Sequence, residues 1–237
     1  MTMIAANLHQ VCTRIAAASR DAGRPGDAVR LLAVSKTFDA PTVRAAFEAG
    51  LTAFGENYVQ EGVAKIEALA DLRGRIEWHC IGPLQSNKTR AVAEHFDWVH
   101  GIDRLKIAQR LSEQRPAHLP PLQVCLQVDV DGGANKSGVG VEEAPALARA
   151  VATLPRLALR GVMAIPEPAP DFEAQRALFL RAATVFERLR ADGLALDTLS
   201  MGMSADLEAA IAAGSTMVRV GSALFGARSA DRSGAPA

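Results

Sequence analysis

The sequence predicts an α/β fold in which eight parallel strands close into a single (β/α)8 TIM barrel. Eight short β-rich runs alternate with helix-like stretches rich in alanine, leucine and charge. Strands that alternate with helices indicate a parallel sheet. The chain has 237 residues and no linker-like stretch. Eight units in one domain-sized chain therefore favour a closed barrel over an open sheet.

The elements follow one another in a regular order. An extra N-terminal helix is predicted over residues 3–22, before the first strand. The eight strands are predicted at 29–36, 52–57, 76–82, 97–102, 122–130, 157–165, 196–201 and 216–221. Helical segments lie between them at 41–49, 59–72, 105–114, 142–154, 172–192 and 205–213.

Several residues mark the ends of these helices. Gly50 and Gly214 follow alanine-rich segments and are typical helix stops. Ser204, with Asp206 two residues later, indicates an N-cap and an acidic first turn. Barrel chemistry gathers where strands end and the next loops begin. The residues expected at that mouth are Lys36, Asn57, Gly82, Asp129, Met163, Ser200 and Gly221.

Composition excludes several classes of partner. The 26 basic and 26 acidic side chains cancel, which leaves no general field for nucleic acid or an anionic membrane. The three cysteines are far apart, show no C-x-x-C spacing and fit a reducing cytosol. No signal peptide or long apolar run is visible. We expect a cytoplasmic protein in which residues 1–228 form the barrel and the small, polar segment 229–237 is a disordered tail.

Lys36 is the first candidate for chemistry. It closes the apolar run Leu31–Ser35, so its amine stands where a buried parallel strand opens onto a ligand. A neutral lysine amine attacks an aldehyde or ketone and holds it as an imine. The alternative is a lysine that simply leaves the core for water.

The last two strands end in glycine- and serine-containing loops. Ser200 and Gly202 follow the seventh strand, and Gly221 and Ser222 follow the eighth. Glycine lets backbone N–H groups approach an anion, serine adds donors, and barrels often bind phosphate in these two loops. The alternative is that the glycines only make tight turns. Two such loops beside the Lys36 strand favour a ligand that carries both a phosphate and a carbonyl.

Pyridoxal 5′-phosphate is such a ligand, and Arg219 strengthens the hypothesis. Arg219 lies two residues before Gly221 on the same face of the strand, so its guanidinium is expected to point at the pyridine nitrogen. A permanently cationic partner keeps that nitrogen unprotonated and makes the ring a poor electron sink. The alternative is an interior arginine in a structural ion pair.

Seven motifs extend the argument over nearly the whole chain and occur in order. They are LLAVSKT (31–37), FGENYVQEG (54–62), WHCIGPLQSNK (78–88), KSG (136–138), RGVMAIP (160–166), LSMGMSADLEAAI (199–211) and VRVGSALFGAR (218–228). This set closely resembles the YggS/PROSC family of pyridoxal-phosphate-binding homeostasis proteins. The resemblance implies a barrel of the alanine racemase N-terminal-domain type and a non-catalytic role in managing the supply of pyridoxal phosphate.

The resemblance also implies roles for individual residues. Lys36 would carry the cofactor as a Schiff base, and Arg219 would face its ring nitrogen. Asn57 would lie near the ring. The phosphate would be held by the loops that contain Ser200, Met201, Gly221 and Ser222. His79 is expected to be a hydrogen-bonded core histidine rather than a base.

Two departures from the family pattern concern packing and charge. Cys80 stands where a bulkier apolar residue is expected, which indicates repacking. Asp129 and Asp131 stand where amide or hydroxyl residues are usual, and their carboxylates would repel a phosphate unless Lys136 or Arg219 offsets them.

Other functions remain open at this point. A racemase or decarboxylase of this type adds a second domain, whereas this sequence ends soon after its eighth strand, and its one tyrosine is Tyr58. A cofactor-free Schiff-base aldolase is a further alternative, with Glu56 as the relay. We expect a monomer whose partners are pyridoxal phosphate and apo-enzymes that require it.

Overall fold

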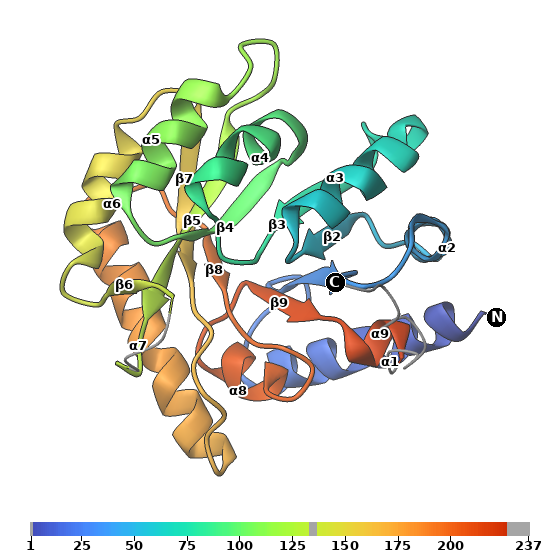
Figure 1. The fold of residues 1–237 in the computed structure, drawn as a ribbon. Helices are drawn as coiled ribbons and strands as arrows, with labels where there is room; N and C mark the ends of the chain where they lie inside the picture. The colour runs from blue at the N-terminus through green and yellow to red at the C-terminus, as the bar shows by residue number, and fades with distance from the viewer. Residues whose placement is uncertain (1, 133–136, 227–237) are drawn as a thin grey trace, which may run out of the picture.

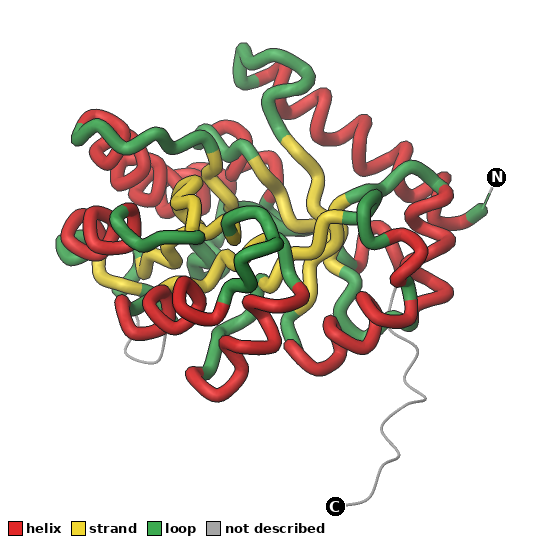
Figure 2. The backbone as a smooth tube through the Cα atoms, turned by 90° about the horizontal axis from the view of Figure 1, so that it is seen from above, coloured by secondary structure: helices red, strands yellow, loops and turns green. Residues whose placement is uncertain are grey.

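Eight parallel strands form a closed barrel surrounded by helices. The computed structural model describes residues 2–132 and 137–226. The strand order is β4-β3-β2-β1-β9-β8-β7-β5, and pairing of β4 with β5 closes the ring. Seen along the other axis, the strands lie inside and the helices outside (Figure 2). The predicted barrel is therefore confirmed.

All eight predicted strands are present, each within a few residues of its expected bounds. They are β1 (Arg30–Val34), β2 (Ala53–Glu56), β3 (Glu77–Cys80), β4 (Trp98–Ile102), β5 (Leu122–Asp129), β7 (Leu157–Met163), β8 (Thr198–Ser200) and β9 (Met217–Val220). A short additional strand, β6 (Val139–Gly140), pairs with the end of β5 outside the ring. It escaped prediction because two residues carry no periodicity.

The helices follow the predicted alternation, and two that were not predicted lie at 89–95 and 222–225. They are α1 (Met3–Asp21), α2 (Ala40–Glu48), α3 (Val59–Ala68), α4 (Thr89–His95), α5 (Leu105–Gln114), α6 (Ala144–Ala152), α7 (Phe172–Ala191), α8 (Leu207–Ala212) and α9 (Ser222–Phe225). Gly50 and Gly214 end α2 and α8 with φ of +107° and +100°, a conformation that favours glycine. The α3 segment ends earlier than predicted because its last turn is a separate 3₁₀ helix at Ala70–Leu72.

The N-terminal helix packs against the C-terminal helices of the barrel. α1 packs against α8 and α9, so the first and last elements of the chain lie side by side (Figure 1). Val11, Ile15 and Ala18 form its buried face. This face covers the part of the ring that would otherwise lack a complete helix, because α8 and α9 are short.

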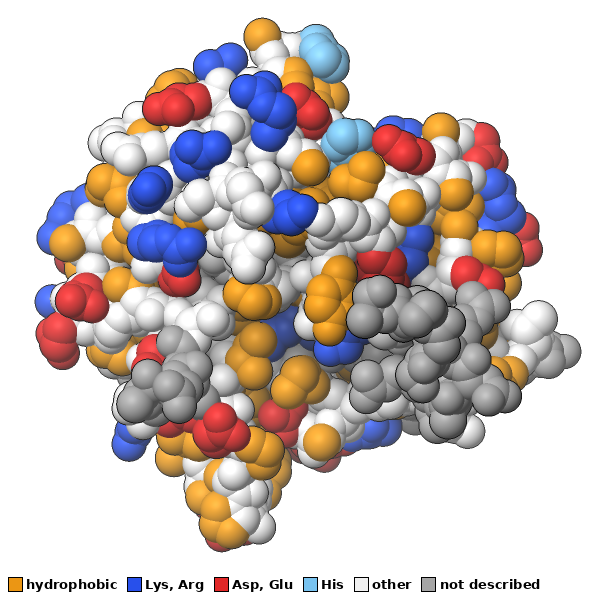
Figure 3. Space-filling model, viewed as in Figure 1, with side chains coloured by type: hydrophobic (Ala, Val, Ile, Leu, Met, Phe, Trp, Pro, Cys, Tyr) orange, Lys and Arg blue, Asp and Glu red, His pale blue; other side chains and the backbone are white. Residues whose placement is uncertain are grey.

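The face of the molecule shown in Figure 3 carries no large patch of purely basic or purely acidic side chains. Basic and acidic side chains are interspersed over the face shown in Figure 3, in line with equal totals of 26 each. Within the described part of the chain, no helix combines the length and apolar character needed to cross a membrane. The predicted tail, 229–237, lies outside the described residues.

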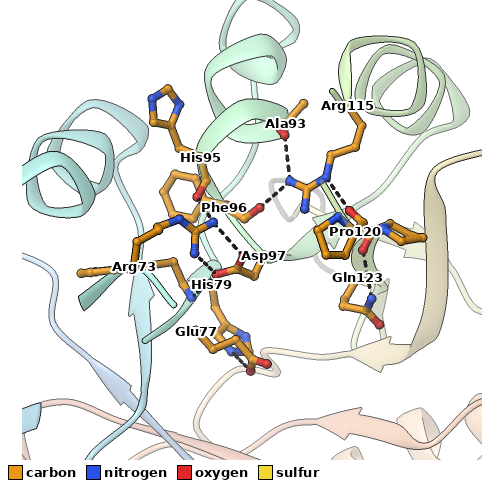
Figure 4. Close-up of polar contacts among 12 residues, drawn as sticks. Arg73, Glu77, His79, Ala93, His95, Phe96, Asp97, Arg115, Pro120 and Gln123 are labelled. Atoms are coloured by element: carbon orange, nitrogen blue, oxygen red, sulfur yellow. Dashed lines mark hydrogen bonds and ion pairs between the residues drawn. The ribbon is translucent and has the colours of Figure 1, made fainter. Parts of the chain in front are cut away.

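A buried arginine connects the end of α4 to the loop before β5, at the amino ends of the strands. Arg115, which follows α5, is 2% exposed. It donates to the carbonyl oxygens of Ala93, Phe96 and Pro120 at 2.7–2.8 Å (Figure 4). These carbonyls belong to the end of α4 and to the loop before β5. The guanidinium therefore satisfies backbone groups that the helix end leaves open.

Replacing Arg115 with methionine is expected to lower the free energy of unfolding by about 3 kcal/mol, because three carbonyls lose their donor. Urea denaturation measures the change. The control is Arg90→Met on α4, where the side chain is 69% exposed. A loss of stability no greater than that of the control would contradict a stabilising role for these three hydrogen bonds.

Candidate functional site

A cavity of about 540 Å³ opens at the carboxyl ends of β1, β8 and β9. Strand β1 pairs with β9, with Leu32 opposite Arg219 and Ala33 opposite Val220. The strand that precedes Lys36 and the last strand are therefore adjacent, as predicted. The lining residues are Val34, Lys36, Thr37, Phe38, Met203, Ser204, Ala205, Arg219, Gly221, Ser222 and Gly226.

Lys36 stands at the rim of this cavity, two residues after β1, and is half-buried. The peptide groups on both sides of it are fixed by side chains from α3. The carbonyl oxygen of Ser35 accepts from Lys65 at 2.7 Å, and the N–H of Thr37 donates to Glu61 at 2.6 Å. Thr37 has φ of +71°, which is unfavourable for a β-branched residue. These bonds therefore hold the backbone at Thr37, directly after the lysine, in a conformation it would not adopt alone.

Lys65 and Glu61, which fix these peptide groups, form a buried ion cluster with Glu56. Lys65 Nζ lies 2.8 Å from Glu56 Oε1 and 2.6 Å from Glu61 Oε1. Glu56 is fully buried and also accepts from the Ser35 hydroxyl at 2.5 Å. Burial raises the pKa of Glu56, and Lys65 opposes that rise. Glu56 is thus engaged by Lys65 and Ser35.

Arg219 provides the buried positive charge of the cavity. It is 3% exposed, and its guanidinium donates to the Ser200 carbonyl, the Ser200 hydroxyl and the Ala164 carbonyl at 2.7–3.0 Å. Burial lowers its pKa to about 10, and the charge of Asp206 opposes the shift. The guanidinium is therefore cationic at neutral pH and bonded to neutral oxygens. The ion pair weighed as the alternative for Arg219 does not appear among these contacts.

The predicted phosphate residues divide into two groups. Gly221 and Ser222 line the cavity, whereas Ser200 and Met201 are fully buried and are not among its lining residues. The Ser200 hydroxyl contacts Arg219 and His100 instead. At Gly221, an added Cβ would come within 3.2 Å of the Val34 carbonyl oxygen, so bare backbone fits there best.

Ser204 has a different place from the one predicted. The expectation that it caps the following helix is wrong, because α8 begins at Leu207 and Asp206 occupies the N-cap. Asp206 accepts from the Met203 N–H and thereby shapes the loop. The Ser204 hydroxyl is left facing the cavity, 3.4 Å from that of Ser222. Two hydroxyls from the two predicted loops therefore meet beside Lys36 and Arg219.

This donor set fits a ligand with a carbonyl and an anionic group. The cavity offers a lysine amine, a buried cation with neutral partners, two hydroxyls and one exposed stretch of glycine backbone. A carbonyl suits the amine, and an anion suits the hydroxyls and backbone. Within the described residues, no cluster of potential metal ligands is present.

Comparison with known proteins gives the family. Residues 6–229 match the model described as alanine racemase, N-terminal domain. A Pseudomonas aeruginosa protein named pyridoxal phosphate homeostasis protein is 60% identical over 228 residues, which cover 96% of this chain and 97% of that protein. The chain belongs to the pyridoxal phosphate homeostasis protein family. The resemblance inferred from the motifs is therefore confirmed.

Other family members show the same relation. The Escherichia coli pyridoxal phosphate homeostasis protein is 55% identical over 229 residues, covering 96% of this chain and 98% of that protein. The structure of PipY from Synechococcus elongatus, solved with PLP bound, has a TM-score of 0.82 and 37% identity. It covers 94% of this chain and 100% of PipY.

In this member of the pyridoxal phosphate homeostasis protein family, the remaining predicted polar residues that the structure describes do not line the cavity. Asn57, after β2, is half-buried and is not among the cavity-lining residues. Asp129 accepts from the N–H groups of Asp131 and Gly132, so its carboxylate shapes a turn. Asp131 accepts from the N–H of Glu167. Lys136, expected to offset these charges, lies outside the described residues.

Sequence reasoning missed two groups of buried polar residues in this family member. Lys65 lies on the face of α3 that buries Val59, Gly62 and Ile66. A charged residue in an apolar stripe was the available signal. His100, in the middle of β4, is fully buried beside His79. His79 itself is a hydrogen-bonded core residue, as expected.

Proposed function

We propose that this chain binds pyridoxal 5′-phosphate in the cavity beside Lys36 and serves to buffer or deliver it in the cell. The observation that carries the proposal is the meeting of Lys36, Arg219, Ser204 and Ser222 around one cavity at the ends of β1, β8 and β9. The PLP-bound structure of PipY and the names of the relatives support the same ligand.

Each residue has a distinct part in this binding. Lys36 attaches the cofactor aldehyde covalently through its amine. Ser204, Ser222 and the Gly221 backbone hold the phosphate. Ser200 supports Arg219 from inside the barrel rather than meeting the phosphate directly. The remaining predicted ligands, Asn57 and Met201, do not line the cavity and are given no contact with the cofactor in this proposal.

The role proposed is non-catalytic. Bound pyridoxal phosphate supplies an electron-withdrawing ring, which is effective when its nitrogen is protonated. A cationic Arg219 at that nitrogen opposes protonation, since two positive charges repel. Tyr58, the single tyrosine, is 60% exposed and is not among the residues that line the cavity. Neither feature favours controlled proton transfer on a substrate.

We further propose that the protein acts in the cytoplasm as a monomer and passes its cofactor to apo-enzymes that use it. The three cysteines are free in the structure, which suits a reducing compartment. Incubation of the loaded protein with amino acids in D2O, followed by NMR, tests the non-catalytic part. Exchange of α-protons at enzyme-like rates would overturn it.

Replacing Ser204 and Ser222 together with alanine is expected to speed loss of the cofactor about tenfold or more, because two donors to the phosphate are removed. Dialysis followed by absorbance measures the half-time. Thr184→Ala, which removes an exposed hydroxyl from α7, is the control. Equal half-times for the double variant and the control would contradict these two residues as phosphate ligands.

A further inference from the structure

A continuous chain of buried polar side chains crosses the barrel interior. Arg219 Nη1 lies 2.8 Å from Ser200 Oγ, which lies 3.0 Å from His100 Nδ1. His100 Nε2 lies 2.9 Å from His79 Nδ1, and His79 Nε2 lies 2.7 Å from Glu77 Oε1. Arg219 lines the cavity, whereas Glu77 lies at the opposite end of the strands, in a groove whose lining includes Asp97 and Trp98. Figure 4 shows Glu77 in contact with His79.

The two ends of this hydrogen-bond chain, Arg219 and Glu77, determine where each proton lies. A carboxylate only accepts, so His79 carries its proton on Nε2 and points it at Glu77. In a neutral ring Nδ1 is then bare and accepts from His100 Nε2–H. His100 Nδ1 is bare in turn and accepts the Ser200 hydroxyl proton. The Ser200 oxygen keeps its lone pairs for Arg219, which only donates.

The reverse direction fails at both ends. With protons on both Nδ1 atoms, His79 Nε2 would present a lone pair to Glu77 at 2.7 Å, and two acceptors would face each other. The Ser200 proton would also lose its acceptor, since the contacts of that hydroxyl within the described residues are with Arg219 and His100. One direction alone satisfies every group.

We infer that His79 and His100 are neutral Nε2–H tautomers in a one-way hydrogen-bond chain from Arg219 to Glu77, and that Glu77, His79 and His100 are positioning residues for the Arg219 guanidinium at the ligand cavity. The part that concerns the ligand rests on the function proposed above. The tautomers do not depend on it, because they follow from contacts present without any ligand.

The surroundings of the two rings favour their neutral forms. Burial lowers the pKa of His100 well below its usual value, and the charge of Arg219 lowers it further. Burial also lowers the pKa of His79, and Glu77 opposes that shift. Trp98 stacks on His79 with centroids 5.2 Å apart. The charged groups that act on these rings are Glu77, Arg30, Asp97 and Arg219.

Charge is thus confined to the two ends of the hydrogen-bond chain, Arg219 and Glu77. Burial would raise the pKa of Glu77, but His79 and Arg30 bring it down to about 2, so the carboxylate is ionised. Hydrogen bonds that point the same way polarise one another. The Ser200 oxygen becomes a better acceptor for Arg219 because its own proton is donated toward a carboxylate. The guanidinium is therefore held against Ser200 by hydrogen bonds to neutral oxygens, with no carboxylate among its contacts within the described residues.

The direct test is the proton position in the ligand-free protein. Long-range ¹H–¹⁵N spectra of uniformly ¹⁵N-labelled protein report the tautomer of each histidine, with exposed His9 and His118 as reference signals. We expect both buried rings to show protonated Nε2 and bare Nδ1, unchanged between pH 5.5 and 8. An Nδ1–H tautomer in either ring, or titration of either ring within this range, would overturn the chain.

The positioning role is tested with paired variants at His100. Leucine removes both chain contacts, whereas the amide of glutamine keeps the direction, accepting from Ser200 and donating to His79. We expect His100→Leu to release pyridoxal phosphate roughly tenfold faster than the parent and to shift the absorbance maximum of the bound cofactor, with most of the loss restored in His100→Gln. Ser112→Ala controls for loss of a buried hydrogen bond elsewhere, since Ser112 bonds to Pro155.

The possible outcomes separate the two proposals. Equal release rates and spectra for His100→Leu, Ser112→Ala and the parent would refute the positioning role. If His100→Leu does not fold, His79→Leu with His79→Gln repeats the comparison one bond further from the cavity. A parent protein that retains no cofactor would refute the proposed function and with it the ligand-positioning role. The tautomer assignment is judged by the NMR result alone.

Discussion

Replacing Lys65 with methionine is expected to lower the free energy of unfolding by about 3–5 kcal/mol. Lys65 is 5% exposed and neutralises Glu56, which is fully buried. Methionine retains most of the side-chain volume but leaves that carboxylate without a cation. It also removes the donor to the Ser35 carbonyl next to Lys36. Denaturant unfolding monitored by circular dichroism measures the loss.

The loss is expected to grow with pH. Burial already raises the pKa of Glu56, and removing Lys65 removes the main opposing effect. A carboxyl whose pKa is raised in the folded state favours folding in its protonated form. That contribution is present below the unfolded-state pKa and disappears as pH rises through the folded-state value. The deficit of Lys65→Met should therefore be larger at pH 8 than at pH 5.

A double variant separates the charge from the packing. In Lys65→Met with Glu56→Gln, no buried charge remains unpaired, so a substantial part of the lost stability should return. Arg44→Met serves as the exposed control, because its ion pair with Asp71 lies at the surface. A Lys65→Met variant no less stable than Arg44→Met at pH 8 would show that the cluster does not stabilise the fold.

Replacing Lys36 with alanine is expected to abolish covalent retention of pyridoxal phosphate completely. The lysine amine at the cavity rim is the group proposed to attach the aldehyde, and among the described residues no other lysine lines the cavity. The variant should lack the visible absorbance of the attached cofactor. Borohydride reduction followed by peptide mass spectrometry should find a pyridoxyl adduct on the Lys36 peptide of the parent and none in the variant.

The fold should tolerate this change. Lys36 is half-buried and lies in a loop, so its truncation should alter the free energy of unfolding by roughly 0.5 kcal/mol or less. Lys106→Ala, an exposed position on α5, is the matched control and should keep both adduct and absorbance. An adduct of undiminished yield in Lys36→Ala, carried by another peptide, would refute the assignment. A colourless parent would favour the aldolase alternative.

The barrel could be predicted because its signal is local and repeated. The eight strands are short β-rich runs, six of them followed by a segment with helical composition, and the structure places all eight in the ring. Elements with little sequence periodicity were not bounded in advance. The two-residue β6 and the four-residue α9 are examples.

The candidate site was predicted less completely because its polar residues are sorted by depth. Ser200, Gly221 and Ser222 all follow the last two strands, but Ser200 points into the barrel and Ser222 into the cavity. Ser204 lines the cavity rather than capping a helix, because α8 begins only at Leu207, with Asp206 at the N-cap position. Sequence order gives the loop to which a serine belongs, and side-chain direction depends on where the strand ends and the helix begins.

The sequence by itself determined the strand and helix order, the position of Lys36 after the first strand and the membership of one family, because these depend on local pattern and on ordered motifs. Only the tertiary structure decided the partners of the buried charges. Glu56 meets Lys65, and Glu77 connects through His79 and His100 to the Ser200 that Arg219 contacts. Glu56 and Lys65 meet where α3 packs back onto β2, and the contact of His100 with Ser200 joins strands 100 residues apart in sequence, in an interior where an unpaired charge is costly.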